Sequence, residues 1–448
     1  MTDAVLRGRL AGHAHGGRFR LFVIGGALLA LAGAALFATA VSGGDADRAW
    51  QLFHVNWLYF TGLAGGSVAI AAVHKITQAK WSGVVLRFAE AAVAFFPVSL
   101  LGLVLIFTVG YDHIYGPMQE QLHVLGHGKA LWLSRPWMFG RLLVGLSALY
   151  YLGWRLIRAD LLPDLADTRD QAEGRRRRRY DAMLAGFDAT EAGRAAQEVR
   201  IHRLAPMYAA TYAMVFSMVA FDAIMALQPH WFSNLLGGFY FMGSFLGAHM
   251  LLALTVMYSG HQTGAWHLVS PKQRHDLGKL CFGFTVFWAY LMYAQFLVIW
   301  YGNLPEETGF VFARLWGSWL PIGRAVFLGV FLIPFFGLLG VTPKKFPGTM
   351  ALFACVSLVG LWLERYLMVM PSVTALEGPA FGLPELGPTL LMLGLFLHAY
   401  GLFARAFPMV SPRLAEITVM AERHHAVEDF KDHDEKASDF LAEPEAGQ

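Results

Sequence analysis

The chain has 448 residues, of which 56% are hydrophobic and only 15% are charged. Soluble globular proteins carry about 25% charged residues, so the composition excludes an ordinary soluble domain and indicates a polytopic membrane protein. The formal net charge of +3 is uninformative as a sum, and no nucleic-acid partner is expected. The two cysteines, Cys281 and Cys355, lie in apolar runs and are expected to be small core residues.

The chain begins with an arginine-rich segment, residues 1–20, and an apolar run follows from Leu21 to Val41. A signal peptide is the competing interpretation, because Ala38-Thr39-Ala40 resembles a cleavage site. The apolar core of a signal peptide is usually about 7–15 residues, and this run is longer. We therefore favour an uncleaved first transmembrane helix over residues 21–43.

The remaining chain predicts an all-α integral membrane protein of about ten transmembrane helices. Further apolar runs cover residues 51–73, 84–109, 137–157, 205–228, 232–258, 278–301, 323–341, 348–370 and 385–404. A multi-helix membrane domain is thus expected over 50–407, with a tail over 408–448. Asn56–Ala71 and Phe239–Ala253 resemble each other, which suggests two four-helix units, spans 2–5 and 6–9, or only the similarity of glycine-rich membrane helices.

The distribution of positive charge orients these spans. On the side that holds both termini we count 28 of the 35 lysines and arginines. By the positive-inside rule both ends are expected to be cytoplasmic. The loop 159–203, with Arg175–Arg179, belongs to this side and is expected to be solvated, with acidic lipid or a partner protein as alternative contacts.

One span carries a polar residue near its middle. The run from Gly278 to Tyr301 contains Gln295, and an unpaired amide in lipid costs several kcal/mol, so Gln295 is expected to face other helices. Asn303 and Pro305 are expected to end the helix.

Ionisable residues at membrane depth are functional candidates, because burying them in lipid is costly. Near the outer side, His54 with Asn56 and Tyr59 is a candidate quinone-binding group, and a helix–helix hydrogen bond is the alternative for His54. Asp222 is a candidate for a proton path or for pairing with an outer arginine.

Further proton-path candidates lie deeper or on the same outer side. Glu364 and Arg365 belong to the outer group and need not pair with each other, because adjacent helical residues point about 100° apart. The candidates near the centre are His249 and His398, of which His249 is alternatively a buried structural histidine.

Toward the cytoplasm, Glu90 either starts a proton path or pairs with Lys75, Lys80 or Arg87. A b-type haem between His249 and His398, or a metal on His123 and His127, is a weaker alternative. No CxxC motif occurs, so no haem, iron–sulfur cluster or metal is expected in this chain.

Three phrases resemble a known family. They are WAYLMYAQFLVIWYGNLPEET (288–308), HKITQAKWSGVVLRFAEAAVAFFP (74–97) and ERYLMVMPS (364–372). The chain from about Trp50 to Phe407 is similar to the ActF subunit of bacterial alternative complex III, within the NrfD/PsrC-like membrane proteins.

The resemblance implies two four-helix bundles plus flanking helices in a bacterial inner membrane. It implies a sister NrfD-like subunit, an iron–sulfur subunit, c-type haem subunits and a terminal oxidase as partners, with quinone or quinol as ligand. The family's proton route or second quinone site would map to Glu90, Gln295 and the Glu364–Arg365 pair.

The function implied is therefore a membrane subunit of a quinol-oxidising complex that has no redox centre of its own and is not catalytic alone, with electrons carried by partner chains. A quinone-binding anchor of a molybdopterin enzyme stays open as an alternative. So does a secondary transporter, although Pro334 is the one proline central to a span.

Overall fold

A computed structural model describes residues 19–259, 266 and 269–416. Within these ranges the chain is helical and has no β-strand. Most of the arginine-rich amino-terminal segment, and the acidic part of the predicted tail beyond residue 416, lie outside the described residues.

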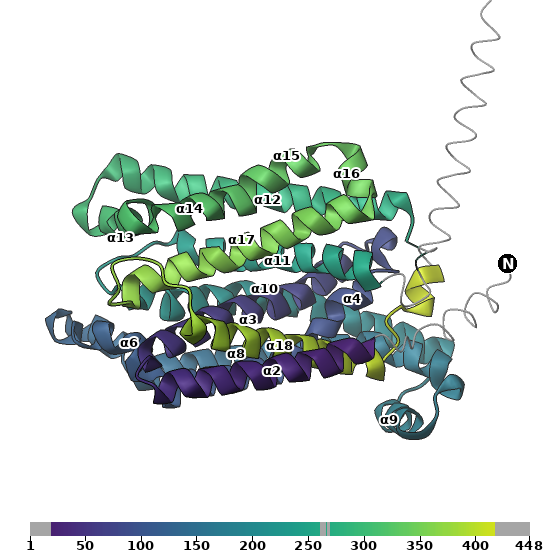
Figure 1. Cartoon of the computed structure of the whole chain (residues 1–448). Helices are drawn as coiled ribbons and strands as arrows, with labels where there is room; N and C mark the ends of the chain where they lie inside the picture. The colour runs from purple at the N-terminus through teal and green to yellow at the C-terminus, as the bar shows by residue number, and fades with distance from the viewer. Residues whose placement is uncertain (1–18, 260–265, 267–268, 417–448) are drawn as a thin grey trace, which may run out of the picture.

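Nine helices of the described chain are long and apolar enough to cross a membrane. They run alongside one another in one elongated bundle (Figure 1), which makes this a multi-pass membrane protein. Their bounds are α2 Phe19–Ser42, α3 Ala46–Ile76, Leu86–Thr108 (α4 Leu86–Glu90, η2 Ala91–Phe95, α5 Phe96–Thr108), α10 Glu191–Ala223 with η5 Met225–Leu227, α11 Leu235–Ser259, α12 Pro271–Gly302, Gly317–Leu339, α17 Pro347–Val373 and α18 Leu383–Ala406.

The predicted span 137–157 lies in α8 (Arg135–Thr168), which does not meet the same criterion. Its 34 residues include Arg141, Arg155 and Arg158, so its charge is high for its length. The described chain therefore has nine such apolar helices, one fewer than the ten expected. α8 nevertheless packs along α10 and α5 within the bundle (Figure 1).

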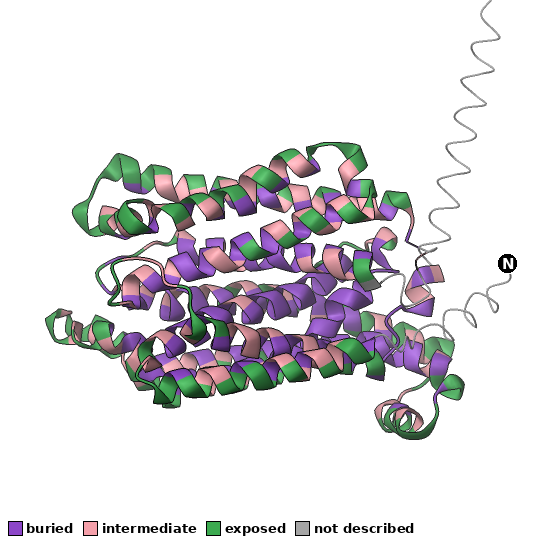
Figure 2. Cartoon of the chain, viewed as in Figure 1, coloured by how far each residue is buried: buried purple, intermediate pink, exposed green. Residues whose placement is uncertain are grey.

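Helix α3 is the centre of the fold. It packs against α10, α11, α17, α18 and α5, and nearly all of its residues are buried (Figure 2). Small residues permit this crowding: a Cβ atom at Gly66 would lie 2.7 Å from the Ser244 carbonyl oxygen of α11. The two segments whose sequences resemble each other, 56–71 and 239–253, therefore belong to helices in close contact.

Helix α12 and the helix of residues 317–339 form an outer layer with α17 (Figure 2). The second helix consists of η7 Gly317–Trp319, α14 Leu320–Val326, the π-helix η8 Phe327–Leu332 and α15 Ile333–Leu339. Both expose much apolar surface, which suits lipid chains. α12 ends as expected, because its C-cap Asn303 adopts a left-handed conformation (φ 46°).

The expectation for the cysteines holds at one of two positions. Cys281 is buried in α12, whereas Cys355 is exposed on α17. The Cys355 side chain therefore belongs to the apolar outer surface of the bundle and not to its core.

The connections are more helical than the sequence indicated. They contain η1 Lys80–Ser82, α6 Tyr111–Gln119, η3 Leu122–Val124, α7 His127–Trp132, η4 Arg169–Gln171, α9 Gly174–Leu184, α13 Pro305–Leu315 and α16 Val341–Lys345. The predicted loop 159–203 is largely the end of α8, then α9 and the start of α10. His123 and His127 fall in different elements, so they do not share one helical face as a metal pair would require.

Candidate functional site

An apolar cleft of 90 Å³ lies where α12, α13, α14 and α17 meet. A water molecule needs about 10–15 Å³ of cavity, so the cleft holds several. Most of the residues that line the cleft are apolar, and the polar ones include Gln295, Arg314 and Glu364. The full lining is Phe239, Trp288, Met292, Gln295, Phe296, Ile299, Phe310, Val311, Arg314, Leu315, Gly323, Val326, Glu364, Leu367 and Met368.

Glu364 brings a buried carboxylate to this cleft. Its Oε1 accepts a hydrogen bond from Arg365 Nη1 at 2.7 Å, so the two neighbours do pair, a possibility that the sequence left open. Although adjacent residues point about 100° apart around the helix, their side chains are long enough to reach each other. The Glu364 Oε2 atom is buried and has no hydrogen bond of normal geometry among the described residues, and the Trp288 side chain interacts with this carboxylate.

Two further features surround that carboxylate. The Arg365 guanidinium lies 4.4 Å from the centre of the Tyr240 ring and donates to the Tyr240 carbonyl at 3.3 Å, which fixes its position. The Trp288 indole N–H also lies at the cleft, and within the described chain it lacks a hydrogen bond of normal geometry. Neither group has a hydrogen bond of normal geometry, and the two interact with each other beside the cleft.

Helix α13 buries Arg314 at the cleft. It donates to the carbonyls of Phe310 (2.9 Å) and Met368 (2.7 Å) and to Ser372 Oγ (2.6 Å). These carbonyl and hydroxyl oxygens satisfy the donors of a buried cation at the wall of the cleft. The amphipathic segment 305–315 was the one signal that could have indicated a buried face.

The predicted quinone group does not converge on one site. His54 bonds through Nε2 to the Ala223 carbonyl at 2.7 Å, at the end of α10. Asn56 bonds to Thr389 of α18 and Trp362 of α17, at 3.0 and 2.9 Å. The Tyr59 hydroxyl donates to a carbonyl of α17, that of Leu358. These contacts join α3 to three different neighbours and match the helix–helix alternative.

Asp222 forms the arginine pair that was one of its two expected roles. Its carboxylate accepts two hydrogen bonds from Arg141 of α8, at 2.6 and 2.5 Å. The Arg141 guanidinium also lies 4.0 Å from the centre of the Trp132 ring. This buried pair joins the ends of α8 and α10 and lies outside the cleft.

The two central histidines lie at different interfaces. His249 Nδ1 bonds to the Phe245 carbonyl at 2.9 Å, and its ring lines a 190 Å³ cavity together with His74 and Trp81. His398 Nδ1 bonds to the Val23 carbonyl of α2, also at 2.9 Å. They do not face each other, so this arrangement does not support a shared haem.

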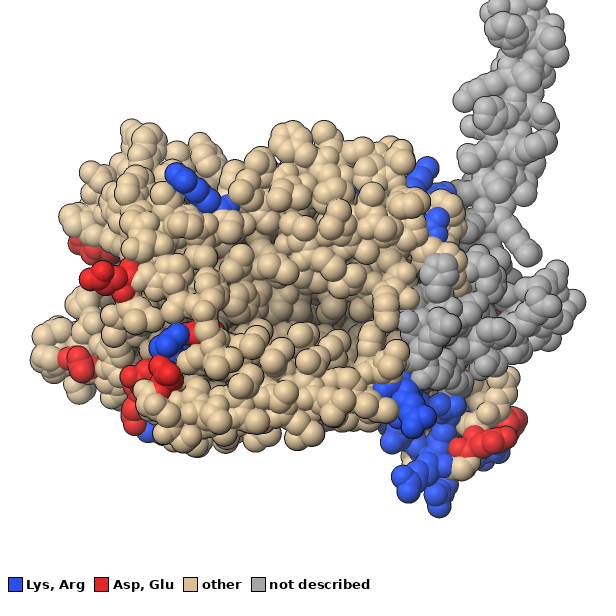
Figure 3. All heavy atoms as spheres, in the orientation of Figure 1, with Lys and Arg blue, Asp and Glu red and all other residues tan. Residues whose placement is uncertain are grey.

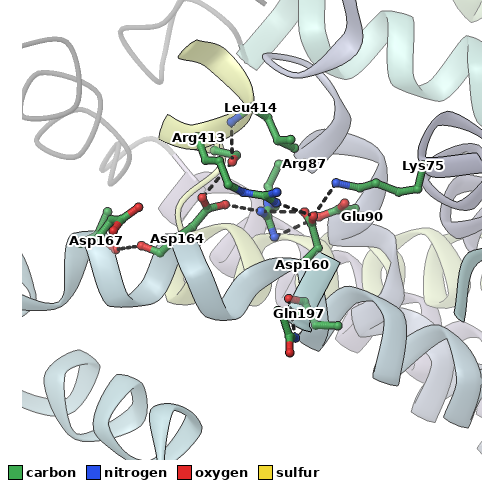
Figure 4. A network of polar contacts seen from close by, with 12 residues as sticks. Lys75, Arg87, Glu90, Asp160, Asp164, Asp167, Gln197, Arg413 and Leu414 are labelled. Atoms are coloured by element: carbon green, nitrogen blue, oxygen red, sulfur yellow. Dashed lines mark hydrogen bonds and ion pairs between the residues drawn. The ribbon is translucent and has the colours of Figure 1, made fainter. Parts of the chain in front are cut away.

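Glu90 belongs to a buried network of charges (Figure 4). Its Oε2 lies 3.0 Å from Arg87 Nη1, which confirms one of the pairings expected for it. Arg87 Nη2 also reaches Asp160 at 3.0 Å and Asp164 at 2.5 Å. Both Glu90 oxygens lack hydrogen bonds of normal geometry within the described chain.

The same network ties down the segment that follows α18. Arg413 donates to Asp160 at 2.9 Å and pairs with Glu198, while Ser411 donates to Asp164 at 2.9 Å (Figure 4). Lys75 also pairs with Asp160. Burial would lower the pKa of Arg413, but the carboxylates around it outweigh that effect and raise it.

Sequence reasoning missed this network because it assigned Asp160 and Asp164 to a solvated loop. Their four-residue spacing, with Leu161 and Leu165 between and after them, was the available signal for a helical face. In the structure all four side chains are buried.

No protein-family model matches this chain, and no curated protein matches it. Within the described ranges, no group of three or more His, Cys, Asp or Glu side chains is placed to hold a metal ion.

Proposed function

We propose that this chain is a membrane subunit of a quinol-oxidising respiratory complex of the alternative complex III type, and that its cleft receives the quinol headgroup. The observation that carries the proposal is the buried Glu364 carboxylate, with one oxygen that lacks a hydrogen bond of normal geometry, at an apolar cleft. A quinol needs this combination: flat apolar walls for its ring and a base for its hydroxyl.

The cleft residues fit such a headgroup. Glu364 Oε2 is an acceptor for a quinol hydroxyl, whereas the Trp288 indole and the Gln295 amide offer donors to a quinone carbonyl. The surrounding helices, α12 and the helix of 317–339, have apolar exposed faces, so an isoprenoid tail would continue into lipid. The quinone site proposed here replaces the group around His54.

Glu364 would act as the base in this scheme. Its Oε2 would accept the hydroxyl proton, and Arg365, held by Tyr240, would stabilise the carboxylate before transfer and position Oε1. The electrons would leave through iron–sulfur and c-type haem subunits, which the family resemblance implies as partners together with a sister membrane subunit and a terminal oxidase.

The finer architecture is part of the same proposal. Spans 2–5 correspond to the α4–α5 helix, α3, α8 and α10, and spans 6–9 to α11, α12, the helix of 317–339 and α17, with α2 and α18 as flanking helices. Within the first set α8 packs against α10 and α5, within the second α12 and α17 pack against the helix of 317–339, and α3 and α11 join the two sets. Basic side chains gather at the end of the bundle that holds α9 (Figure 3), which supports cytoplasmic termini in a bacterial inner membrane.

A proton route would use the groups that have an atom without a hydrogen bond of normal geometry or that border open space. Glu90 at the α9 end, and His249 beside His74 in the 190 Å³ cavity, are the candidates that retain unpaired atoms or open space. Asp222 and His398 have structural partners and are not part of the proposed route.

Photolabelling tests the proposal. An azidoquinone should label α12 and α17 in the purified native complex, and Glu364→Gln with Gln295→Leu should abolish that labelling while the complex still assembles. Mass spectrometry of the complex should identify iron–sulfur and c-type haem chains. Molybdopterin-enzyme partners would favour the alternative anchor role, and labelling elsewhere would refute the cleft assignment.

A further inference from the structure

A second cavity, of 580 Å³, lies at the end of the bundle that carries α9, between that helix and the last turn of α18. We call it the arginine pocket. It is lined by Gln171, Glu173, Arg175, Arg176, Arg179, Leu402, Arg405 and Ala406. Figure 3 shows the Lys and Arg side chains gathered in this region, beside a smaller group of acidic ones.

The positive charge of the arginine pocket is not neutralised by the described chain. Four arginines face one carboxylate, that of Glu173. Arg175, Arg179 and Arg405 form no ion pair with any described residue. Arg176 donates to the Arg405 carbonyl at 2.9 Å, which is a bond to a neutral acceptor.

Other arginines of the same region do find carboxylates. Arg177 lies 3.2 Å from Asp170, and Arg169 lies 2.7 Å from Asp181. Acidic residues are thus available on α9 and η4, yet they pair with arginines outside the pocket. The fold concentrates unpaired guanidinium groups on the face of α9 that meets α18.

The arginines gathered at the pocket repel one another electrostatically. Burial lowers the pKa of Arg176, and the positive charges of Arg405 and Arg179 lower it further, against an opposing effect of Tyr180. A bound anion would relieve this repulsion. Guanidinium groups suit phosphate in particular, because their planar donors bond to two of its oxygens at once.

The floor of the pocket indicates where the phosphate would come from. Leu402 and Ala406 belong to α18, a membrane-spanning helix, so the pocket lies where the hydrocarbon region ends. Leu402 is 49% exposed and extends the apolar floor toward lipid. A soluble anion would gain nothing from that surface, whereas a phospholipid would place acyl chains on it.

We propose that the arginine pocket binds the phosphate headgroup of an anionic phospholipid from the membrane leaflet next to α9. The bound lipid would bridge α9 to α18 and neutralise guanidinium groups that otherwise repel one another. The inference rests on membrane insertion of α18 and does not depend on the quinol proposal.

Native mass spectrometry of the full-length protein tests it, after release from nanodiscs of phosphatidylcholine with 20% phosphatidylglycerol, a composition of about physiological anionic content. The test variant is Arg176→Gln/Arg179→Gln/Arg405→Gln. The control Arg178→Gln/Arg200→Gln/Arg203→Gln removes the same charge from exposed arginines outside the pocket. We expect the test variant to retain roughly tenfold less phosphatidylglycerol than the wild type, and the control to retain nearly the wild-type amount.

Three further measurements extend the test: salt dependence, competition by phosphate, and truncation of the tail. The amount of phosphatidylglycerol that the wild type retains should fall as the sodium chloride concentration rises, and this measurement needs no variant. Equal lipid loss in both triple variants would show general surface attraction and overturn the proposal. So would inorganic phosphate that displaces phosphatidylglycerol at millimolar concentration, since that indicates a soluble-anion site. Removal of residues 417–448 that raises retention several-fold would show the acidic tail to be the occupant and would likewise overturn it.

Discussion

At the scale of single residues, Glu364 and Asp222 are both buried carboxylates, yet their partners differ. Asp222 uses both oxygens on Arg141, whereas Glu364 uses one oxygen on Arg365 and leaves the other at the cleft. A carboxylate with a free lone pair beside open space can exchange a proton with a ligand; one held by two hydrogen bonds has no such freedom. The two residues should therefore respond differently to amide substitution.

Glu364→Gln should lower quinol oxidation per assembled complex by roughly a hundredfold, because an amide keeps the shape but cannot accept the proton. Assembly should change little. The measurement is steady-state turnover normalised to complex content. Glu385→Gln is the matched control, since Glu385 is a buried carboxylate paired with Arg48 away from the cleft. Equal activity losses in both variants would argue against a specific role for Glu364.

Asp222→Asn should instead lower the free energy of unfolding by about 3–5 kcal/mol, because it leaves the Arg141 guanidinium without its counter-charge. Turnover of the surviving complex should stay near the wild-type value. Thermal unfolding in detergent measures the loss, and the charge swap Asp222→Arg/Arg141→Asp should recover part of it. A stable Asp222→Asn complex with low turnover would instead indicate that Asp222 belongs to the proton path.

At the scale of helices, the sequence predicted positions well and partners poorly. Hydropathy placed the spans, since lipid demands long apolar runs, and Asn303 ended α12 as expected. Contacts between helices depend on geometry that no local pattern encodes. His54, Asn56 and Tyr59 lie within six residues, yet they face three different helices. Gln295 and Glu364 are 69 positions apart, yet they line one cleft.

The contact of α2 with α18 depends on glycine. A Cβ atom at Gly33 would lie 2.2 Å from the Leu391 amide nitrogen, whereas one at Gly25 would meet nothing within 4 Å. Gly33→Leu should therefore displace α2 and lower the free energy of unfolding by about 3 kcal/mol, the upper end of the usual cost of overpacking. Gly25→Leu should change it little. Thermal unfolding of the two variants decides the matter. Equal stability would mean that α2 is not held by this interface.

The segment after α18 depends on the buried charge network. Arg413→Gln removes the ion pairs to Asp160 and Glu198, which should raise local opening of residues 407–416 roughly 30-fold, for a loss of about 2 kcal/mol. Hydrogen exchange of that segment measures the effect. Arg203→Gln, an exposed arginine of α10, is the control. Unchanged protection in Arg413→Gln would show that apolar burial alone holds the segment.

At the scale of the whole molecule, the charge distribution and the hydropathy predict different numbers of transmembrane helices. Hydropathy selects nine spans, which would put the two ends of the described chain on opposite sides. The lysine and arginine distribution favours an even number, because basic residues precede α2 and also follow α18. If α8 also crosses the membrane, the number of spans is ten and the two counts agree. At about 1.5 Å per residue its 34 residues extend about 50 Å, which is longer than the hydrocarbon core.

The crossing of α8 predicts labelling from opposite sides. In a background without Cys281 and Cys355, Lys129→Cys precedes α8 and Arg178→Cys follows it, and both positions are exposed. A membrane-impermeant maleimide should label Lys129→Cys in intact spheroplasts, and Arg178→Cys only after the membrane is opened. The physical reason is that Asp222 neutralises Arg141, while Arg155 and Arg158 follow the apolar stretch 142–154, so that stretch carries no charge. Labelling of both cysteines from one side would make α8 a surface helix and place the described ends of the chain on opposite sides.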